Sequence, residues 1–283
     1  MQKVFSPSSL DSYENCPKKY HFRYVEKLPV DQEGIEAFVG KRVHEVLERL
    51  YRFTDEGQIP TLERVLWRFR QMWHEHFDEK RLRIVRRETS FDDYRQNGVR
   101  CLENAYRQLY PFDRGETLGL EHPIQFELPG GGDYRMRGII DRLVRAPDGV
   151  LEIHDYKTGK RVPRQEQIDR DRQLALYEIG VRQQTGEEGE VRLVWHYLFG
   201  GQVRTSQRSE AERNELAAKT RSVIDRIRCE TEWKTKKSAL CDWCEYRVWC
   251  PAFDEDAWAR RPKVDAPVRQ RAGADGDDQL TLL

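Results

Sequence analysis

The sequence predicts an α/β fold in which helices flank a mixed sheet, and three observations support this prediction. Segments with the alternating apolar pattern and bounding turn residues of β-strands occur at 122–128, 134–144 and 150–156. The Pro147-Asp148-Gly149 turn between the last two segments indicates an antiparallel hairpin. Helical patterns at 164–185 and 209–228 then enclose a strand at 191–199, so we expect helices to cover the sheet.

The N-terminal part is predicted to be helical. Ser6 followed by Pro7 indicates a helix start, because serine caps free amides and proline fits the first turn. Cys16-Pro17 ends this short helix. A second helix is expected at 36–51, where apolar residues recur at helical spacing and His44 lies beside their stripe.

The remaining segments set the domain organisation. Residues 61–110 keep a helical period with one interruption, which predicts a helical insertion at about 55–115. The C-terminal composition shifts to Arg, Pro, Gly, Ala and Asp without periodicity, so we expect a disordered tail at 259–283. A single domain at 1–258 is therefore expected.

Composition excludes several classes of protein. The 283 residues are 35% charged but also 38% hydrophobic, which is too apolar for a disordered polyelectrolyte. Lys plus Arg and Asp plus Glu both number 49, so any nucleic-acid binding must use local patches. We find no apolar run of ~18 residues and no secretory signal, and we expect a soluble cytoplasmic protein without membrane contact. In that compartment six cysteines favour metal binding over disulfides.

One predicted strand face carries an acid and a base. Side chains two apart share a face, so Asp155 and Lys157 point the same way as Leu151 and Ile153. Buried charges need partners or a metal, although a surface ion pair at the strand end is the simpler alternative. Across the hairpin, Asp141 brings a second carboxylate. A hard cation such as Mg²⁺ or Mn²⁺ would relieve the repulsion, and Lys157 would serve the attacking water, which predicts metal-assisted phosphodiester hydrolysis.

These residues resemble a known family. Gly138-Ile-Ile-Asp141 followed by Asp155-Tyr-Lys157-Thr-Gly is similar to the signature of the PD-(D/E)XK nucleases, specifically the RecB-like exonucleases and the CRISPR-associated adaptation nucleases. The resemblance extends to Gly40-Lys-Arg-Val-His44 on a helix and to Glu121 on the preceding strand. It continues in Gln173-Leu-Ala-Leu-Tyr177 on the helix after the lysine.

The resemblance implies a role for each matching residue. The metal ligands would be His44, Asp141, Asp155 and the backbone carbonyl of Tyr156. Lys157 would activate or position the water, and Glu121 would act through the metal's water shell. Gln173 and Tyr177, four apart on one helical face, would steady Lys157 or the DNA backbone. Taken singly, such a histidine or Gln/Tyr pair is more often structural.

Four cysteines form a second constellation. Cys241-Asp-Trp-Cys244 followed by Cys250 gives three closely spaced thiols, and Cys16, also followed by proline, is the natural fourth. By spacing alone, a structural Zn²⁺ site and an iron–sulfur cluster are equally plausible. One N-terminal and three C-terminal cysteines around a nuclease core resemble the AddB-like iron–sulfur nucleases. This resemblance implies a [4Fe–4S] cluster that joins the N- and C-terminal regions.

Two further segments suggest partners. Lys80-Arg-Leu-Arg83 could track a DNA backbone together with the aromatic residues Trp67, Phe69, Trp73 and Phe77, although aromatics at helical spacing are usually core. The segment Gln279-Leu-Thr-Leu-Leu283 resembles peptides that dock on the bacterial sliding clamp, with Leu283 in place of the usual phenylalanine. Otherwise it is a frayed end.

The sequence as a whole predicts a metal-dependent deoxyribonuclease. We expect an exonuclease that acts on single-stranded or frayed DNA ends in repair or recombination. No G-x-x-x-x-G-K loop is found, so ATP-driven unwinding would require a helicase partner. The alternatives are a CRISPR adaptation nuclease that trims prespacers and a catalytically silent DNA-binding scaffold. The intact Asp141, Asp155 and Lys157 argue against the silent scaffold.

Overall fold

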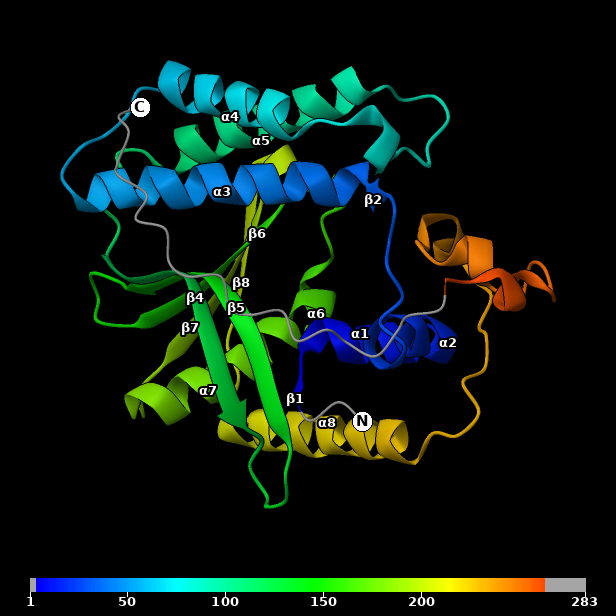
Figure 1. Cartoon of the computed structure of the whole chain (residues 1–283). Helices are drawn as coiled ribbons and strands as arrows, with labels where there is room; N and C mark the ends of the chain where they lie inside the picture. The colour runs from blue at the N-terminus through cyan, green and yellow to red at the C-terminus, as the bar shows by residue number, and fades with distance from the viewer. Residues whose placement is uncertain (1–3, 263–283) are drawn as a thin grey trace, which may run out of the picture.

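A six-stranded mixed sheet forms the centre of the protein (Figure 1). The computed structural model describes residues 4–262. The strands are β1 (Val4–Phe5), β4 (Glu116–Glu127), β5 (Arg135–Arg145), β6 (Leu151–Lys157), β7 (Val191–Tyr197) and β8 (Gln202–Ser206). Helices cover both faces of this sheet, which confirms the predicted α/β fold class.

Strand β5 is the hub of the sheet. One of its edges pairs antiparallel with β4 along the whole hairpin. Its other edge is shared, because β1 pairs in parallel at Arg135 and Met136 while β6 pairs antiparallel at Arg142–Arg145. Strand β6 also pairs in parallel with β7, whose far edge pairs antiparallel with β8. Sequence patterns predicted the β5–β6 hairpin but missed β8, which is short, largely polar and at the sheet edge.

Three helices form the layer over one face: α3 (Ile35–Asp55), α4 (Leu62–His76) and α5 (Phe91–Leu109) (Figure 1). Their buried side chains share one core with Tyr156 of β6. The opposite face packs against α1 (Pro7–Asn15), α7 (Gln173–Thr185) and α8 (Glu210–Cys229) in a second core. The sheet therefore lies between two separate apolar layers.

The start of α1 follows the predicted pattern. The Ser6 side chain accepts a hydrogen bond from the backbone N–H of Ser9, and the Ser9 side chain accepts one from the N–H of Ser6. The helix ends where Cys16 takes an extended conformation, and the short α2 (Pro17–Tyr20) follows, continued by a π-helical turn, η1 (His21–Val25). Cys16 is thus held at a sharp junction between two helices.

The single helix predicted at 164–185 is wrong, because the chain breaks after α6 (Gln165–Ile168). Asp171 accepts a hydrogen bond from the N–H of Gln173, which caps the start of α7. Arg208, from a distant segment, donates to the carbonyl oxygens of Ile168 and Asp171. A long-range contact therefore stabilises a break that local periodicity does not reveal.

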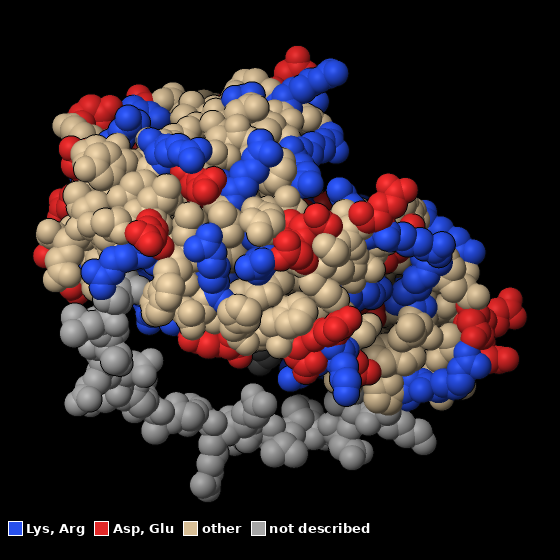
Figure 2. All heavy atoms as spheres, turned by 90° about the horizontal axis from the view of Figure 1, so that it is seen from above, with Lys and Arg blue, Asp and Glu red and all other residues tan. Residues whose placement is uncertain are grey.

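The aromatic groove proposed from the sequence is not formed. Phe69 and Trp73 are 0% and 5% exposed, and Phe77 packs against the same core, so these rings join α4 to its neighbours. Trp67 alone of the four rings is exposed. The basic segment lies in η2 (Glu79–Arg81) and β3 (Leu82–Arg83), and β3 pairs with β2 (Glu33–Gly34). Over the helical layer, positive and negative side chains are interspersed (Figure 2).

The C-terminal turns pack beside the N-terminal helices (Figure 1). These turns are η4 (Ala239–Trp243), η5 (Arg247–Trp249) and η6 (Ala257–Arg260). Phe22, Leu28 and Tyr246 form a small core between the two ends of the chain. Within residues 4–262, no helix combines the length and apolarity needed to cross a bilayer. Most of the predicted tail, including the clamp-like segment 279–283, lies outside the described residues.

Candidate metal centre

The sheet forks between β5 and β6. Their ladder ends at the Arg142–His154 pair, and beyond it β6 continues paired with β7 alone. The main-chain groups of Tyr156 therefore find partners outside that ladder. Its N–H donates to Asp141 Oδ2 at 2.7 Å, and its carbonyl oxygen lies 2.8 Å from His44 Nε2. These two contacts fix the Asp141 carboxylate and the His44 imidazole beside Tyr156 of β6, where β6 no longer pairs with β5.

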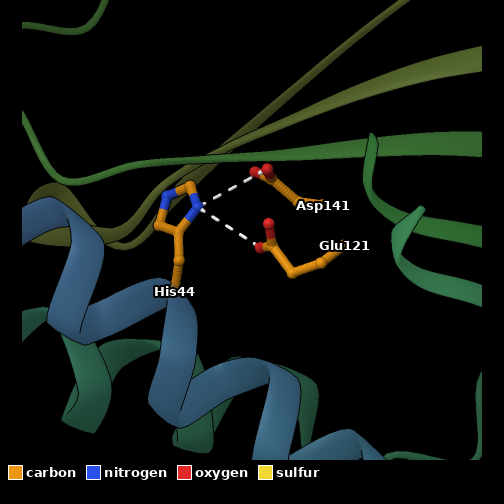
Figure 3. A group of neighbouring side chains, drawn as sticks. All are labelled: His44, Glu121 and Asp141. Carbon is orange, nitrogen blue, oxygen red and sulfur yellow. Dashed lines mark ion pairs between the residues drawn. The ribbon is translucent and has the colours of Figure 1, made fainter. Parts of the chain in front are cut away.

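Three side chains from three elements converge beside the fork. His44 from α3, Glu121 from β4 and Asp141 from β5 point toward one another (Figure 3), with ligand atoms within 4.8 Å of each other. His44 Nδ1 lies 3.4 Å from Asp141 Oδ1 and 3.9 Å from Glu121 Oε1. The two acids face each other across the β4–β5 ladder, a like-charge arrangement that is unfavourable without a cation. The cluster therefore has the composition of a metal site.

The backbone at Glu121 is strained. Its φ of +42° lies in the left-handed region, which costs a non-glycine residue ~1–3 kcal/mol. The β4–β5 register has no pair at Glu121, whereas Leu120 pairs with Arg142 and His122 with Ile140 on either side. Glu121 was expected to act through the water shell, but its position places it directly in the three-residue cluster.

Proximity shifts the ionisation of this cluster. Burial raises the pKa of Glu121 to about 7, and the Asp141 charge adds to the shift while His44 opposes it. Burial alone would lower the pKa of His44. The hydrogen bond and charge of Asp141, together with the charge of Asp155, outweigh burial and raise the His44 pKa to about 9. Without a metal, His44 is therefore protonated and Glu121 partly protonated near neutral pH.

Metal binding should release a proton from His44. With a pKa of about 9, the imidazole is protonated at neutral pH, whereas a metal ligand must be neutral. The affinity for Mn²⁺ should thus increase as the pH rises toward about 9, by at most about tenfold per unit for one proton. Calorimetric titration in buffers of different ionisation enthalpy measures this release. A constant affinity from neutral pH to about 9 contradicts the expectation. His44→Asn should remove the dependence above about pH 8 and leave only the part near pH 7 that comes from Glu121.

A second group faces α7. Lys157 Nζ donates to Asp155 Oδ1 and to Gln173 Oε1, both at 3.0 Å, and Gln173 Nε2 donates to Asp155 Oδ1 at 3.1 Å. The three side chains therefore hold one another in place. Asp155 Oδ2 lies 2.8 Å from Lys157 Nζ, yet it is buried and accepts no hydrogen bond. The Lys157 ammonium is thus the neighbour that balances the charge of this buried oxygen.

Burial and mutual contact shift the pKa values of both Asp155 and Lys157. Burial raises the pKa of Asp155, although Lys157 opposes the shift. Burial would lower the pKa of Lys157, but the charge and hydrogen bond of Asp155 outweigh it, and the pKa is raised. Lys157 is therefore an ammonium at neutral pH and acts as a hydrogen-bond donor.

Tyr177 explains the glycine in the Gly138-Ile-Ile-Asp141 motif. Tyr177 lies one turn after Gln173 on α7, is 6% exposed, and packs directly over β5 at Gly138. A Cβ atom at Gly138 would lie 2.1 Å from Tyr177 Cε1. Burial raises the pKa of Tyr177, whereas hydrogen bonds with Gln173 and the Ile139 backbone oppose this shift. Gly138 was not among the predicted site residues, although a glycine inside a strand often marks a close approach.

Gly138→Ala should displace Tyr177 and disturb Gln173. We expect a loss of ~1–3 kcal/mol in the free energy of unfolding and roughly tenfold slower cleavage. Thermal unfolding and a nuclease assay measure both. The double variant Gly138→Ala/Tyr177→Ala should lose less stability than the sum of the losses in the two single variants, because the new methyl group no longer meets the tyrosine ring. Gly159→Ala is the matched control, since nothing lies within 4 Å of its Cβ position.

The residues present fit a hard divalent cation. The ligand atoms of His44, Glu121 and Asp141 all lie within 4.8 Å of one another, close enough for one cation to contact all three. Nδ1 is the His44 nitrogen that faces the two acids, whereas Nε2 lies 2.8 Å from the Tyr156 carbonyl oxygen. Carboxylate and carbonyl oxygens with one imidazole favour Mg²⁺ or Mn²⁺. Asp155 differs from the expected ligand set: its charge acts on His44, but its oxygens lie outside the three-residue cluster.

The four predicted cysteines are also brought together. A cavity of about 280 Å³ is lined by Cys16, Cys241, Cys244 and Cys250. Within residues 4–262, no three of these sulfur atoms lie within 4.8 Å of one another. Lys18 and Lys19 line the same cavity, so positive charge is available to balance thiolates. The donor set therefore fits a thiolate-bound metal group.

The fold and this geometry define an α/β domain with a candidate divalent-metal centre at a forked sheet. The family model of the PD-(D/E)XK nuclease superfamily matches residues 4–251. The chain therefore belongs to this superfamily, whose members use divalent metals.

Two solved structures illustrate the similarity. A protein from Eubacterium rectale named "Putative exonuclease" aligns with a TM-score of 0.49 and 13% identity, over 86% of this chain and 88% of that chain. The crystal structure of SSO0001 aligns with a TM-score of 0.32 and 15% identity, over 87% and 95% of the two chains. Because both TM-scores are below 0.5, neither alignment supports a functional argument. No curated protein matches the chain.

Proposed function

We propose that the protein is a Mg²⁺- or Mn²⁺-dependent deoxyribonuclease that hydrolyses phosphodiester bonds. The forked sheet is the observation that carries this proposal. It brings the imidazole of His44 and the carboxylates of Glu121 and Asp141 together at one strand end. Asp155 and Lys157 lie on the neighbouring strand of the same fork. Membership in the PD-(D/E)XK superfamily supports the same reaction.

Each side chain has a proposed task. His44, Asp141, Asp155 and the Tyr156 carbonyl would hold the cation, and Glu121 would contact it directly or through water. When bound, the cation supplies positive charge at the phosphate and lowers the pKa of a coordinated water. Lys157 donates hydrogen bonds to the attacking water or to a phosphate oxygen, which offsets developing negative charge. Gln173 hydrogen-bonds to both Asp155 and Lys157 and so holds the Lys157 ammonium in position. Tyr177, one turn later on α7, holds Gln173 in place.

The proposed substrate is single-stranded DNA or a frayed duplex end, cut by an exonuclease in repair or recombination. The resemblance of the motifs to RecB-like exonucleases supports this choice. A helicase partner would supply unwound ends, because no ATP-binding loop is found in the sequence.

An assay with end-labelled DNA tests the function. Purified protein should cut single-stranded DNA in the presence of Mn²⁺ or Mg²⁺ and leave it intact with EDTA. Parallel 5′ and 3′ labels distinguish an exonuclease, which releases short products from one end, from an endonuclease. Metal-independent cleavage would reject the mechanism. Binding without any cleavage would favour the silent scaffold instead.

The cysteine cavity is proposed to hold a [4Fe–4S] cluster, with structural Zn²⁺ as the alternative. Two points support this assignment: Cys16, Cys241, Cys244 and Cys250 line one cavity, and their arrangement of one N-terminal and three C-terminal cysteines resembles that of the AddB-like iron–sulfur nucleases. Iron analysis and broad absorbance near ~400 nm test the assignment, and a colourless protein with stoichiometric zinc would overturn it.

A further inference from the structure

The β4–β5 hairpin has one bare face next to the metal centre. Ile124 and Phe126 on its other face pack against Gly180 of α7. Side chains alternate along a strand, so the bare face continues from Glu121 and Asp141. Its next cross-strand pair is Pro123 with Ile139, and Gln125 with Arg137 follows. We call Pro123, Arg137 and Ile139 the hairpin ledge.

The ledge is apolar where it meets the metal centre. Ile139 is 53% exposed, and Pro123 beside it is also exposed. A single exposed isoleucine needs no explanation by itself. This one shares a strand face with Asp141, two residues away, and faces a second exposed apolar residue. The pair forms an apolar platform at the edge of the reaction site.

Exposed cations that form no ion pair within residues 4–262 lie on both sides of the fork. Hydrogen bonds with Ser90 lower the pKa of the Asp93 carboxyl, and one of these cations, Lys160, is near enough to lower it further. Arg137 is exposed and forms no ion pair within residues 4–262, whereas nearby Arg135 pairs with Asp133. On the other side, Lys41, Lys160 and Arg161 are exposed and equally form no ion pair in the described chain.

These cations border the catalytic elements. Lys41 precedes His44 by three positions and therefore lies on the same side of α3. The turn of α3 at Gly40 packs against Thr158, in the loop that carries Lys160 and Arg161. Lys160 rests on the ring of Phe199, 4.9 Å from its centroid. Positive charge therefore lines the path before and after the metal centre.

We propose that one single strand of DNA crosses the fork, with nucleotides on one side of the scissile bond lying on the hairpin ledge. The phosphates on the other side lie against Lys41, Lys160 and Arg161. A strand rises ~3.4 Å per residue, so Arg137 lies ~14 Å along β5 from Asp141, the length of a few nucleotides. The inference rests on the proposed nuclease function.

The apolar platform selects a single strand over a duplex. Unpaired bases expose apolar rings that can pack on Pro123 and Ile139, and such contacts are sequence-tolerant. A duplex keeps its bases stacked inside and presents mainly phosphates. A surface with basic side chains alone would bind the phosphates of a duplex, whereas this combination of apolar and basic side chains favours single-stranded DNA.

The binding of labelled oligothymidylate, followed by fluorescence anisotropy, tests the role of the hairpin ledge. Ca²⁺ replaces Mg²⁺ so that affinity is measured apart from cleavage. Ile139→Ala should weaken binding about tenfold. Arg137→Ala should lower the slope of log affinity against log salt by about 0.7, the loss of one phosphate contact. Arg137→Lys should retain the slope. The matched controls are Ile59→Ala and Arg70→Ala. Ile59 is 45% exposed between α3 and α4, and Arg70 is exposed on α4 and forms no ion pair with any described residue; both variants should bind normally.

Unchanged binding by both ledge variants would overturn the inference, even if the protein proves to be a nuclease. If the protein binds duplex DNA as tightly as single-stranded DNA, and Ile139→Ala weakens both equally, the proposed preference for a single strand would be overturned. Conversely, a protein that never cuts DNA but loses binding in the ledge variants would reject the proposed function and retain the ledge. Circular dichroism confirms that each variant is folded.

Discussion

Asp155→Ala is expected to reduce DNA cleavage about 10³-fold or more. The change removes a buried carboxylate that is 4% exposed and hydrogen-bonded to both Lys157 and Gln173. Without it the site loses a proposed metal ligand and the anchor of its ammonium group. Because the change leaves the Lys157 ammonium without its carboxylate partner, the free energy of unfolding should also decrease. Single-turnover cleavage with Mn²⁺, together with thermal unfolding, measures both effects.

Two variants separate chemistry from metal binding. Lys157→Met should also abolish cleavage, yet it should keep or tighten Mn²⁺ binding because a competing positive charge is removed. Asp55→Ala, an exposed acid at the end of α3, is the matched control and should cut at the normal rate. If Asp155→Ala cuts as fast as the unchanged protein, the proposed mechanism is rejected.

Cys250→Ser is expected to cause the largest loss of stability. Cys16 and Cys241 are 225 positions apart (241 − 16), so a metal group joining them closes almost the whole described chain. Cross-links around loops longer than ~100 residues stabilise by ~5 kcal/mol, which corresponds to a fall of ~10–20 °C in Tm. Calorimetry should show this fall together with loss of bound iron.

Cys229→Ser is the control for this substitution. Cys229 is exposed and does not line the four-cysteine cavity, so its variant should keep the iron content and Tm. A Cys250→Ser protein that retains full iron and an unchanged Tm would show that the cavity does not hold a joining metal group.

Sequence patterns predicted the features that depend on local periodicity. The Ser6 cap, the β5–β6 hairpin and the start of α8 after Ser209 all follow from short-range rules. The β5–β6 fork could not be predicted in this way. It depends on the Tyr156 N–H finding Asp141 instead of a ladder partner, a choice made by the folded sheet.

The site residues likewise divide into those that the sequence motifs indicated and those features that only the folded structure reveals. Motif resemblance identified His44, Asp141, Asp155 and Lys157, and the structure places them around one fork. No sequence rule indicates a positive φ at a glutamate, so the direct position of Glu121 in the cluster could not be foreseen. The roles of these residues remain predictions for the experiments above.

The pairing of β1 with β5 has a consequence for biosynthesis. Val4 and Phe5 find their partners only when residues 135 and 136 emerge, and Cys16 must wait for Cys241. At ~5–20 residues per second, these delays are roughly 7–26 s and 11–45 s. During that time the first helices leave the ribosome without their final neighbours. The segment from β1 to Cys16 is thus synthesised well before the residues on which it packs.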